Sequence, residues 1–154
     1  MTLLALTTSS EAANTYTVKR VYDGDTLVLE NDKRVRLIGV DTPEMRDKNR
    51  NLKDAIKYGL AAKTVDAYAD KAKFFVKDAV EGKRVRLEYG KERKDKYGRT
   101  LAYVYRVPDN YFVNAEVVKQ GYGFAFTRFP FKYRERFKEY EREAKAGKKG
   151  LWGG

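Results

Sequence analysis

The chain has 154 residues, with 33 Lys and Arg against 22 Asp and Glu, and carries a formal net charge of +11 at pH 7. It contains neither cysteine nor histidine, which excludes disulfides, thiolate or histidine zinc centres, and every mechanism that uses a histidine base. Any catalyst in this chain must work with carboxylates, arginine, lysine, tyrosine and metals that prefer oxygen ligands.

Size and charge narrow the class of protein. A chain of this length is expected to form one domain with a real hydrophobic core. The positive charge suits a polyanionic partner, either nucleic acid or an anionic membrane surface. A lysine-rich surface that only aids solubility explains the charge equally well. No apolar run approaches the roughly 20 residues that span a bilayer.

The first 14 residues differ from the rest in composition. An apolar run at 3–6 and small residues at 9–13 resemble the end of a secretory signal, which predicts a secreted or cell-envelope protein. The segment lacks a basic start and a full apolar core, so a disordered leader is the alternative. The folded domain is predicted to span residues 15–152.

Three short strands, at 15–22, 27–30 and 34–40, are predicted to form a meander. The first turn, Asp23-Gly24-Asp25, suits a tight hairpin because Asp-Gly tolerates positive φ. Pro43 ends the third strand, since proline cannot donate to a ladder.

A long helix is predicted for residues 54–80, with Asp54 as its cap and Gly82 after its end. The polar segment 45–51 before it is expected to be a mobile loop. Apolar residues recur every three to four positions and predict the buried face of the helix: Ile56, Leu60, Val65, Tyr68, Ala72, Phe75 and Ala79.

The second half predicts strands at 83–89 and 101–106 around a charged hairpin, a short helix that Asn114 caps, and a last helix at 132–146. Leu151 and Trp152 are expected to pack back onto the body. Five strands with a helix between the third and fourth is the order of an OB-fold. The predicted class is α+β, a five-stranded Greek-key β-barrel with about three helices.

Charged side chains gather at the end of the third predicted strand. Asp41 and Glu44 follow the strand, and Arg36 lies within it. Because one rigid strand end carries all three, the arrangement favours a site for a metal and a phosphate. A purely structural ion pair between Arg36 and Glu44 is the alternative.

Two turns add to this group. Alone, the Asp23–Thr26 turn and the basic hairpin at 96–99 are common surface features. Asp23 is expected only to serve its turn, and simple capping of the hairpin is the alternative for Arg99. Their joint presence, in this order on a predicted small barrel, favours a functional role for both turns.

From about residue 15 to residue 152 the sequence resembles the staphylococcal nuclease (thermonuclease) family. The matching segments are Val-Tyr-Asp-Gly-Asp-Thr at 21–26, the whole of 35–44, Lys-Tyr-Gly at 57–59, Asp-Lys-Tyr-Gly-Arg at 95–99, Leu-Ala-Tyr at 101–103, Val-Asn at 113–114 and Gln-Gly at 120–121. The first helix looks longer than is usual in the family.

The resemblance implies a calcium-dependent nuclease that hydrolyses DNA and RNA and leaves 3′-phosphate ends. We expect a monomer without a membrane span that favours single-stranded substrates. The implied roles are metal binding by Asp25, Asp41 and the carbonyl of Thr42, catalysis by Arg36, Glu44 and Arg99, and contact with a terminal phosphate by Lys96 and Tyr97.

Elementary chemistry agrees with these roles. Ca²⁺ takes 6–8 oxygen ligands at about 2.3–2.6 Å, so two carboxylates and a carbonyl leave room for water and a phosphate oxygen. The ion acts as a Lewis acid, and arginine can hold a phosphate bidentately. Glu44 can reach a metal-bound water, but an ordinary pKa near 4.3 makes it a weak base. Whether it takes the proton or orients the water is left open.

The family's base-stacking tyrosines follow the Gln-Gly motif, and here that region carries Phe and Tyr in shifted places. Tyr122, Phe126 and Phe129 are stacking candidates, since stacking needs only a flat face, and core packing is the equal alternative. A non-catalytic nucleic-acid-binding barrel competes with the enzyme, and a basic domain that docks on acidic proteins or lipids is a weaker option. Retention of all five acidic and arginine site residues favours the enzyme.

Converging carboxylates also predict a stability effect. Without a metal, Asp25, Asp41 and Glu44 should repel one another. The sequence therefore predicts that Asp25→Asn is nearly inactive yet at least as stable as the parent when no metal is present.

Overall fold

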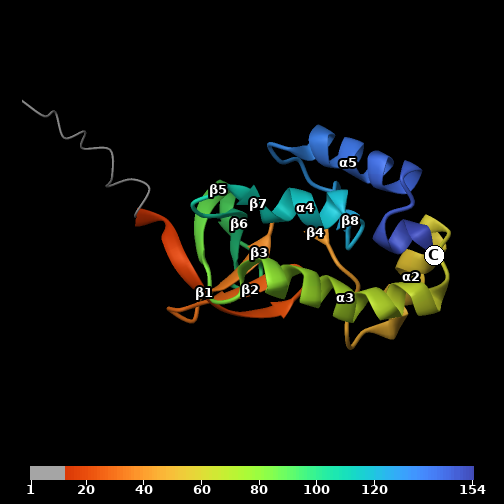
Figure 1. Ribbon diagram of the computed structural model, residues 1–154, viewed down its shortest axis with the longest axis horizontal. Coiled ribbons are helices and arrows are strands. Elements are labelled where there is room, and N and C mark those ends of the chain that lie inside the picture. The colour runs from red at the N-terminus through yellow and green to blue at the C-terminus, as the bar shows by residue number, and fades with distance from the viewer. Residues whose placement is uncertain (1–12) are drawn as a thin grey trace, which may run out of the picture.

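The computed structural model describes residues 13–154, so the predicted leader lies outside the described part except for its last two residues (Figure 1). Six strands form one sheet in the order β3-β2-β1-β5-β6-β7, and β3 also pairs in parallel with β6. The predicted α+β OB-fold is confirmed. The strands of this sheet are β1 (Thr15–Asp23), β2 (Thr26–Leu29), β3 (Arg34–Leu37), β5 (Arg84–Lys94), β6 (Thr100–Arg106) and β7 (Tyr111–Phe112).

The β1–β2 turn is pressed against the rest of the protein. A Cβ added to Gly24 would lie 2.7 Å from the Cβ of Ala72 and 2.8 Å from the side chain of Thr42. No larger residue fits without displacing one of them. The absent side chain of Gly24 therefore lets the turn bring Asp25 close to Thr42.

The predicted strand at 34–40 is interrupted. β3 ends at Leu37, and a short strand, β4 (Val40–Asp41), pairs with β8 (Phe124–Ala125) in a separate two-stranded sheet. Gly39 makes the break with φ +77, a conformation that side chains disfavour. The break turns Asp41 away from the ladder of β3.

The single helix predicted for 54–80 is wrong, because two helices occupy the region. α2 (Lys48–Tyr58) begins within the segment expected to be a mobile loop, and Asp47 caps it by accepting a hydrogen bond from the backbone N of Arg50 at 3.0 Å. Gly59, at φ +67, ends α2 before α3 (Ala62–Val80) begins. The helical register therefore does not continue across the break, and Ile56, predicted to be buried, is 75% exposed.

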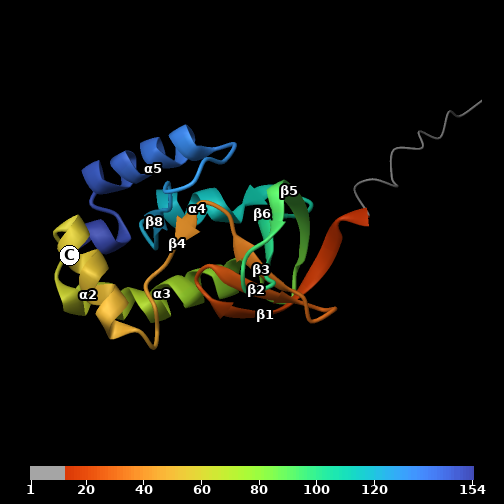
Figure 2. The same ribbon diagram turned by 180° about the vertical axis from the view of Figure 1, so that it is seen from behind.

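The remaining helices cover the short sheet. Figures 1 and 2 show α4 (Val113–Lys119) and the β4–β8 pair between α3 and α5 (Arg134–Ala146). A short 3₁₀ helix, Gly150–Gly153, follows, and there Leu151 is buried and Trp152 packs against Tyr58 and Phe124, as predicted. The described residues thus hold four α-helices where about three were expected.

The described part of the chain has no helix that is both long and apolar enough to cross a membrane.

The sequence predicted that Asn114 caps a helix, and this prediction is wrong. The capping position of α4 is Phe112, which makes no side-chain cap bond. Asn114 is fully buried, accepts a hydrogen bond from the backbone N of Val104 at 2.8 Å, and donates to the carbonyls of Ile38 and Ala102 at 3.0 and 3.1 Å. Its amide therefore ties β6 to the break between β3 and β4.

Replacing Asn114 by Ala should destabilise the fold. The change leaves the buried amide of Val104 and the carbonyl of Ile38 without this partner, and each unsatisfied buried group costs about 1–3 kcal/mol. We expect a loss of about 2 kcal/mol or more in the free energy of unfolding, measured by urea titration with an unchanged slope. A loss within about 0.5 kcal/mol, as is usual for surface substitutions, would show that the bridge does not support the fold.

Candidate active site

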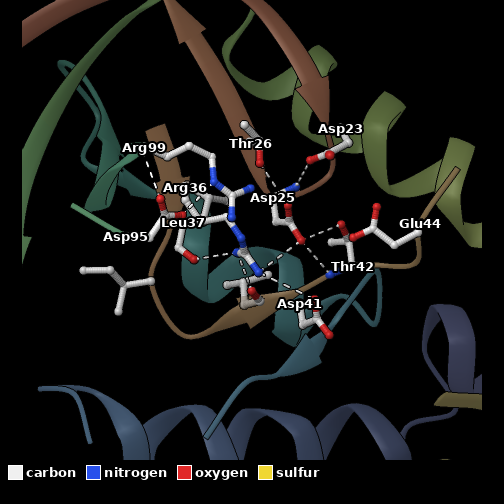
Figure 3. Close-up of polar contacts among 12 residues, drawn as sticks. Asp23, Asp25, Thr26, Arg36, Leu37, Asp41, Thr42, Glu44, Asp95 and Arg99 are labelled. Carbon is white, nitrogen blue, oxygen red and sulfur yellow. Dashed lines mark hydrogen bonds and ion pairs between the residues drawn. The ribbon is translucent and has the colours of Figure 1, made fainter. Parts of the chain in front are cut away.

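Asp25 is a buried carboxylate with partners on both oxygens (Figure 3). Its Oδ2 accepts hydrogen bonds from the backbone N and the Oγ1 of Thr42 at 3.0 and 3.1 Å, and its Oδ1 accepts one from the Oγ1 of Thr26 at 3.1 Å. Asp23 accepts a hydrogen bond from the backbone N of Asp25 at 3.1 Å, which is the turn role expected for it. The hairpin therefore holds Asp25 rigidly against the segment after β4.

Arg36 joins the two aspartates that were predicted to bind metal. Its Nη2 lies 3.4 Å from Oδ2 of Asp25 and 3.5 Å from Oδ1 of Asp41. Its Nη1 donates to the carbonyls of Leu37 and Val40 at 2.9 and 2.6 Å, so the backbone around the Gly39 break orients the guanidinium. The alternative ion pair between Arg36 and Glu44 is not formed among the described residues, because Glu44 pairs elsewhere.

The partner of Glu44 is Arg50, which the sequence analysis did not single out. Nη1 of Arg50 lies 2.6 Å from Oε1 of Glu44, and Nη2 lies 2.5 Å from Oδ1 of Asp41. Arg50 is in the first turn of α2, in the segment expected to be a mobile loop. Recognising Asp47 as the helix cap would have put Arg50 in the first turn of a helix, but its approach to the acids depends on how α2 folds back on Glu44.

Asn51 was also missed, and it fixes the backbone of Glu44. It accepts a hydrogen bond from the backbone N of Glu44 and donates one to its carbonyl, both at 2.8 Å. It is 1% exposed and also donates to Asp66 on α3 at 2.8 Å. The main chain of Glu44 is therefore anchored to both helices, although it lies outside regular structure.

Burial is the largest influence on the pKa values of these carboxyl groups. Burial, followed by repulsion from Asp25, raises the pKa of Asp23 to about 7. Burial also raises the pKa of Asp41 and of Glu44. At Asp25 burial is outweighed by the charge of Arg36 and by hydrogen bonds, so its pKa is lowered. Glu44 is therefore a stronger base than its ordinary pKa implies.

Asp95 holds Arg99 on the hairpin between β5 and β6. Its Oδ2 accepts a hydrogen bond from Nε of Arg99 at 2.7 Å, and its Oδ1 accepts from the backbone N of Tyr97 and of Arg99 at 2.9 and 3.0 Å. Neither Nη atom of Arg99 has a hydrogen-bond partner within residues 13–154. Lys96 and Tyr97 are exposed, Tyr97 to 71%, at the tip of the hairpin.

The three stacking candidates lie in different surroundings. Tyr122 is half-buried and stacks on Phe75 with the ring centroids 4.3 Å apart, so its ring is part of the packing against α3. The ring of Phe126 lies beside that of Phe129, with the centroids 6.1 Å apart, and Phe129 is 62% exposed. Phe129 is thus the most exposed of the three candidates, and the guanidinium of Arg128 lies over its ring at 5.8 Å from the centroid.

The donor chemistry of the site fits a hard divalent cation. Asp25 and Asp41 offer carboxylate oxygens that approach the same nitrogen of Arg36, and oxygen ligands are those that Ca²⁺ and Mg²⁺ prefer. Across residues 13–154, however, no three acidic side chains gather closely enough to hold an ion together. The residues therefore fit an ion that takes two carboxylates and completes its shell with other oxygens.

Replacing Asp25 by Asn should destabilise the protein in the absence of metal, which reverses the expectation from sequence. The change removes the charge that faces Arg36 and weakens three hydrogen bonds to an ionised acceptor, and such bonds contribute about 1.5–3 kcal/mol each. We expect a loss of roughly 1–3 kcal/mol, measured as a urea midpoint with chelator present. Asp32→Asn, at an exposed acid paired with Lys19, is the control and should change little. An Asp25→Asn protein as stable as its parent would restore the original expectation.

The stabilising effect of Asp95 should depend on pH. Burial alone would raise its pKa, but hydrogen bonds from Arg99 and Tyr97 outweigh burial and lower it. Because the folded pKa lies below the unfolded one, the stabilisation is complete above the ordinary value of 3.8 and is lost as the pH falls through the folded value. Asp95→Asn should therefore lower the free energy of unfolding at neutral pH, and the difference from the parent should shrink between about pH 5 and about pH 3. If the difference in unfolding free energy between the parent and Asp95→Asn stays constant over that range, Asp95 does not have a lowered pKa in the folded protein.

Comparison with known proteins gives the family. A family model described as "Staphylococcal nuclease homologue" matches residues 34–154. The chain is 37% identical to a protein named thermonuclease from Staphylococcus hyicus over 94% of this chain and 79% of that protein. It is 41% identical to one of the same name from Staphylococcus intermedius, over 89% and 75%, and 36% identical to endonuclease YncB from Bacillus subtilis, over 88% and 60%. The chain therefore belongs to the staphylococcal nuclease family.

Proposed function

We propose that this protein is a calcium-dependent nuclease that hydrolyses phosphodiester bonds of DNA and RNA and leaves 3′-phosphate ends. Membership of the family, with relatives named thermonuclease and endonuclease, supports a nuclease hydrolase. The observation that carries the proposal is the guanidinium of Arg36 between two buried aspartates, with Glu44 three residues beyond the second one.

Asp25, Asp41 and the carbonyl of Thr42 would hold the calcium ion. When bound, the ion supplies Lewis-acid polarisation of the phosphate that is to be cleaved. The two aspartates are already held in place without it, Asp25 by Thr42 and Thr26, and Asp41 by the two arginines. The carboxylates themselves therefore need little rearrangement to meet an ion, although Arg50 lies on one oxygen of Asp41.

Glu44 is suited to take a proton from the attacking water. In the metal-free protein burial raises the pKa of Glu44 above its ordinary value, which makes it a stronger base than an exposed carboxylate. Attack by water on phosphorus forms a new P–O bond and breaks the bond to the 5′ oxygen, which leaves as a hydroxyl after taking a proton from solvent, so the phosphate stays on the 3′ side. Arg36 is positioned to stabilise the charge that accumulates on the phosphate oxygens, because its orientation is fixed before substrate arrives.

Arg99 and the hairpin extend the site toward the rest of the substrate. The bond to Asp95 fixes Arg99 through Nε and leaves its outer nitrogens for a phosphate. Lys96 and Tyr97 lie at the exposed tip, where a charged and an aromatic side chain can meet a flexible strand. The net charge of +11 favours any polyanion, which supports both DNA and RNA as substrates. The exposed rings of Tyr97 and Phe129 support single strands above duplexes, because only unpaired bases are free to stack on them.

Cleavage of supercoiled DNA and of RNA with Ca²⁺, with Mg²⁺ and with chelator tests the proposal. Two carboxylates that leave the rest of the shell to other oxygens suit a large ion with flexible coordination, so Ca²⁺ should support turnover better than Mg²⁺, which requires near-octahedral geometry. Chelator should abolish cleavage, and end labelling should find 3′-phosphates. Equal or greater activity in Mg²⁺ would refute the assignment of calcium, and binding without cleavage in any ion would indicate a non-catalytic barrel.

The role of Arg36 can be tested by measuring the kinetics of cleavage by the parent and by Arg36→Lys. Arg36→Lys keeps the charge but loses the two-pronged contact, so kcat should fall by about 10²–10³ with little change in KM. Arg142→Lys, at an exposed residue of α5, is the matched control. A change confined to KM would show that Arg36 serves only ground-state binding.

A further inference from the structure

Arg50 and Arg36 both contact Asp41, but they are held very differently. Arg36 is 14% exposed and has two backbone carbonyls as well as two aspartates as partners. Arg50 is 41% exposed, and its guanidinium contacts only the carboxylates of Asp41 and Glu44 among the described residues. Of the two cations at the site, Arg50 is the one that can leave without breaking backbone contacts.

The backbone that carries Arg50 is nevertheless fixed. Asp47 accepts a hydrogen bond from its backbone N, and the next residue, Asn51, holds the main chain of Glu44. The side chain therefore enters the site from a rigid helix start and has solvent on its outer side. It can swing outward while Glu44 and the helix stay in place.

The position of Arg50 conflicts with a metal ion at Asp41. Both arginines contact the same oxygen of Asp41, Oδ1. Nη2 of Arg50 lies 2.5 Å from it and Nη2 of Arg36 lies 3.5 Å from it. A divalent cation that used this carboxylate would meet the Arg50 charge at close range, where like charges repel strongly. The same guanidinium also occupies Glu44, which the proposed mechanism needs free to meet a water.

We propose that Arg50 is a built-in counter-cation, which neutralises Asp41 and Glu44 in the metal-free protein and which the divalent ion must displace in order to bind. This inference rests on the proposed function, because it takes Asp41 as a metal ligand. Arg50 therefore stabilises the metal-free site and weakens its affinity for metal. A merely structural ion pair would do the first of these but not the second.

Calcium titration calorimetry at low ionic strength on the whole chain distinguishes the two roles. Arg50→Gln should bind Ca²⁺ about tenfold more tightly than the parent or better, because a like charge is removed from close range. Arg46→Gln removes the same charge two residues after Glu44, from a side chain that is exposed and without an ion pair in the described part, and it should tighten binding by about twofold at most. Mg²⁺ and Mn²⁺ are titrated in parallel.

Thermal unfolding gives a second readout that does not depend on activity. With chelator, Arg50→Gln should melt lower than Arg46→Gln, because Asp41 and Glu44 lose their counter-charge. With saturating Ca²⁺, the rise in Tm should be larger for Arg50→Gln than for either of the other proteins. Arg50→Lys, which keeps a charge but not the two-pronged grip, should lie between the parent and Arg50→Gln in calcium affinity, and it decides the matter should Arg50→Gln fail to fold.

The outcomes separate failure of this inference from failure of the function. If the parent cleaves DNA with bound calcium and Arg50→Gln or Arg50→Lys binds the ion no more tightly than Arg46→Gln, the counter-cation role is wrong and the proposed function stands. If neither the parent nor any variant binds any of the three ions, both are wrong.

Discussion

The contact on which the site depends is the guanidinium of Arg36 between the carboxylates of Asp25 and Asp41. Two acids this close and this buried are costly unless a cation compensates them. The fold supplies that cation from β3 and orients it with the carbonyls on either side of the Gly39 break. The interruption of β3 thus supplies the two carbonyls that hold Arg36 and separates Asp41 from the ladder of β3.

The start of α2 completes the charge balance. Asp25, Asp41 and Glu44 converge on Arg36 and Arg50, and each guanidinium contacts two of the three acids. The two cations differ in their other partners, since Arg36 also donates to two backbone carbonyls and Arg50 contacts only the carboxylates. A fixed arginine can serve the phosphate, and a loosely held one can give up its place.

The residues of the site could be predicted from the sequence better than their contacts. The family resemblance rests on short motifs that contain Asp25, Arg36 and Asp41. The structure brings these three side chains together. Arg50 and Asn51 could not be found in this way, because their roles depend on α2 starting early and folding back on Glu44.

The errors in the fold have physical causes. Apolar spacing across residues 54–80 looks continuous, and only the positive φ of Gly59 reveals that one helix ends there. Asparagine is a common helix cap. The amide of Asn114 instead forms hydrogen bonds with buried backbone groups of Val104, Ile38 and Ala102. The end of α2 is local, because Gly59 adopts the left-handed conformation that closes a helix, whereas at Asn114 tertiary partners overrode the local preference. The two opposite expectations for Asp25→Asn arise in the same way, since the repulsion was visible in the sequence and the compensating hydrogen bonds were not.

The most direct measurement of the central claim is an anomalous difference map from crystals of the protein grown with Mn²⁺ or Ca²⁺. The account predicts a peak within coordination distance of both Asp25 and Asp41, with Arg36 still on the carbonyls of Leu37 and Val40. A peak elsewhere on a protein that cleaves nucleic acid with that ion would contradict the claim that these two aspartates form the metal site.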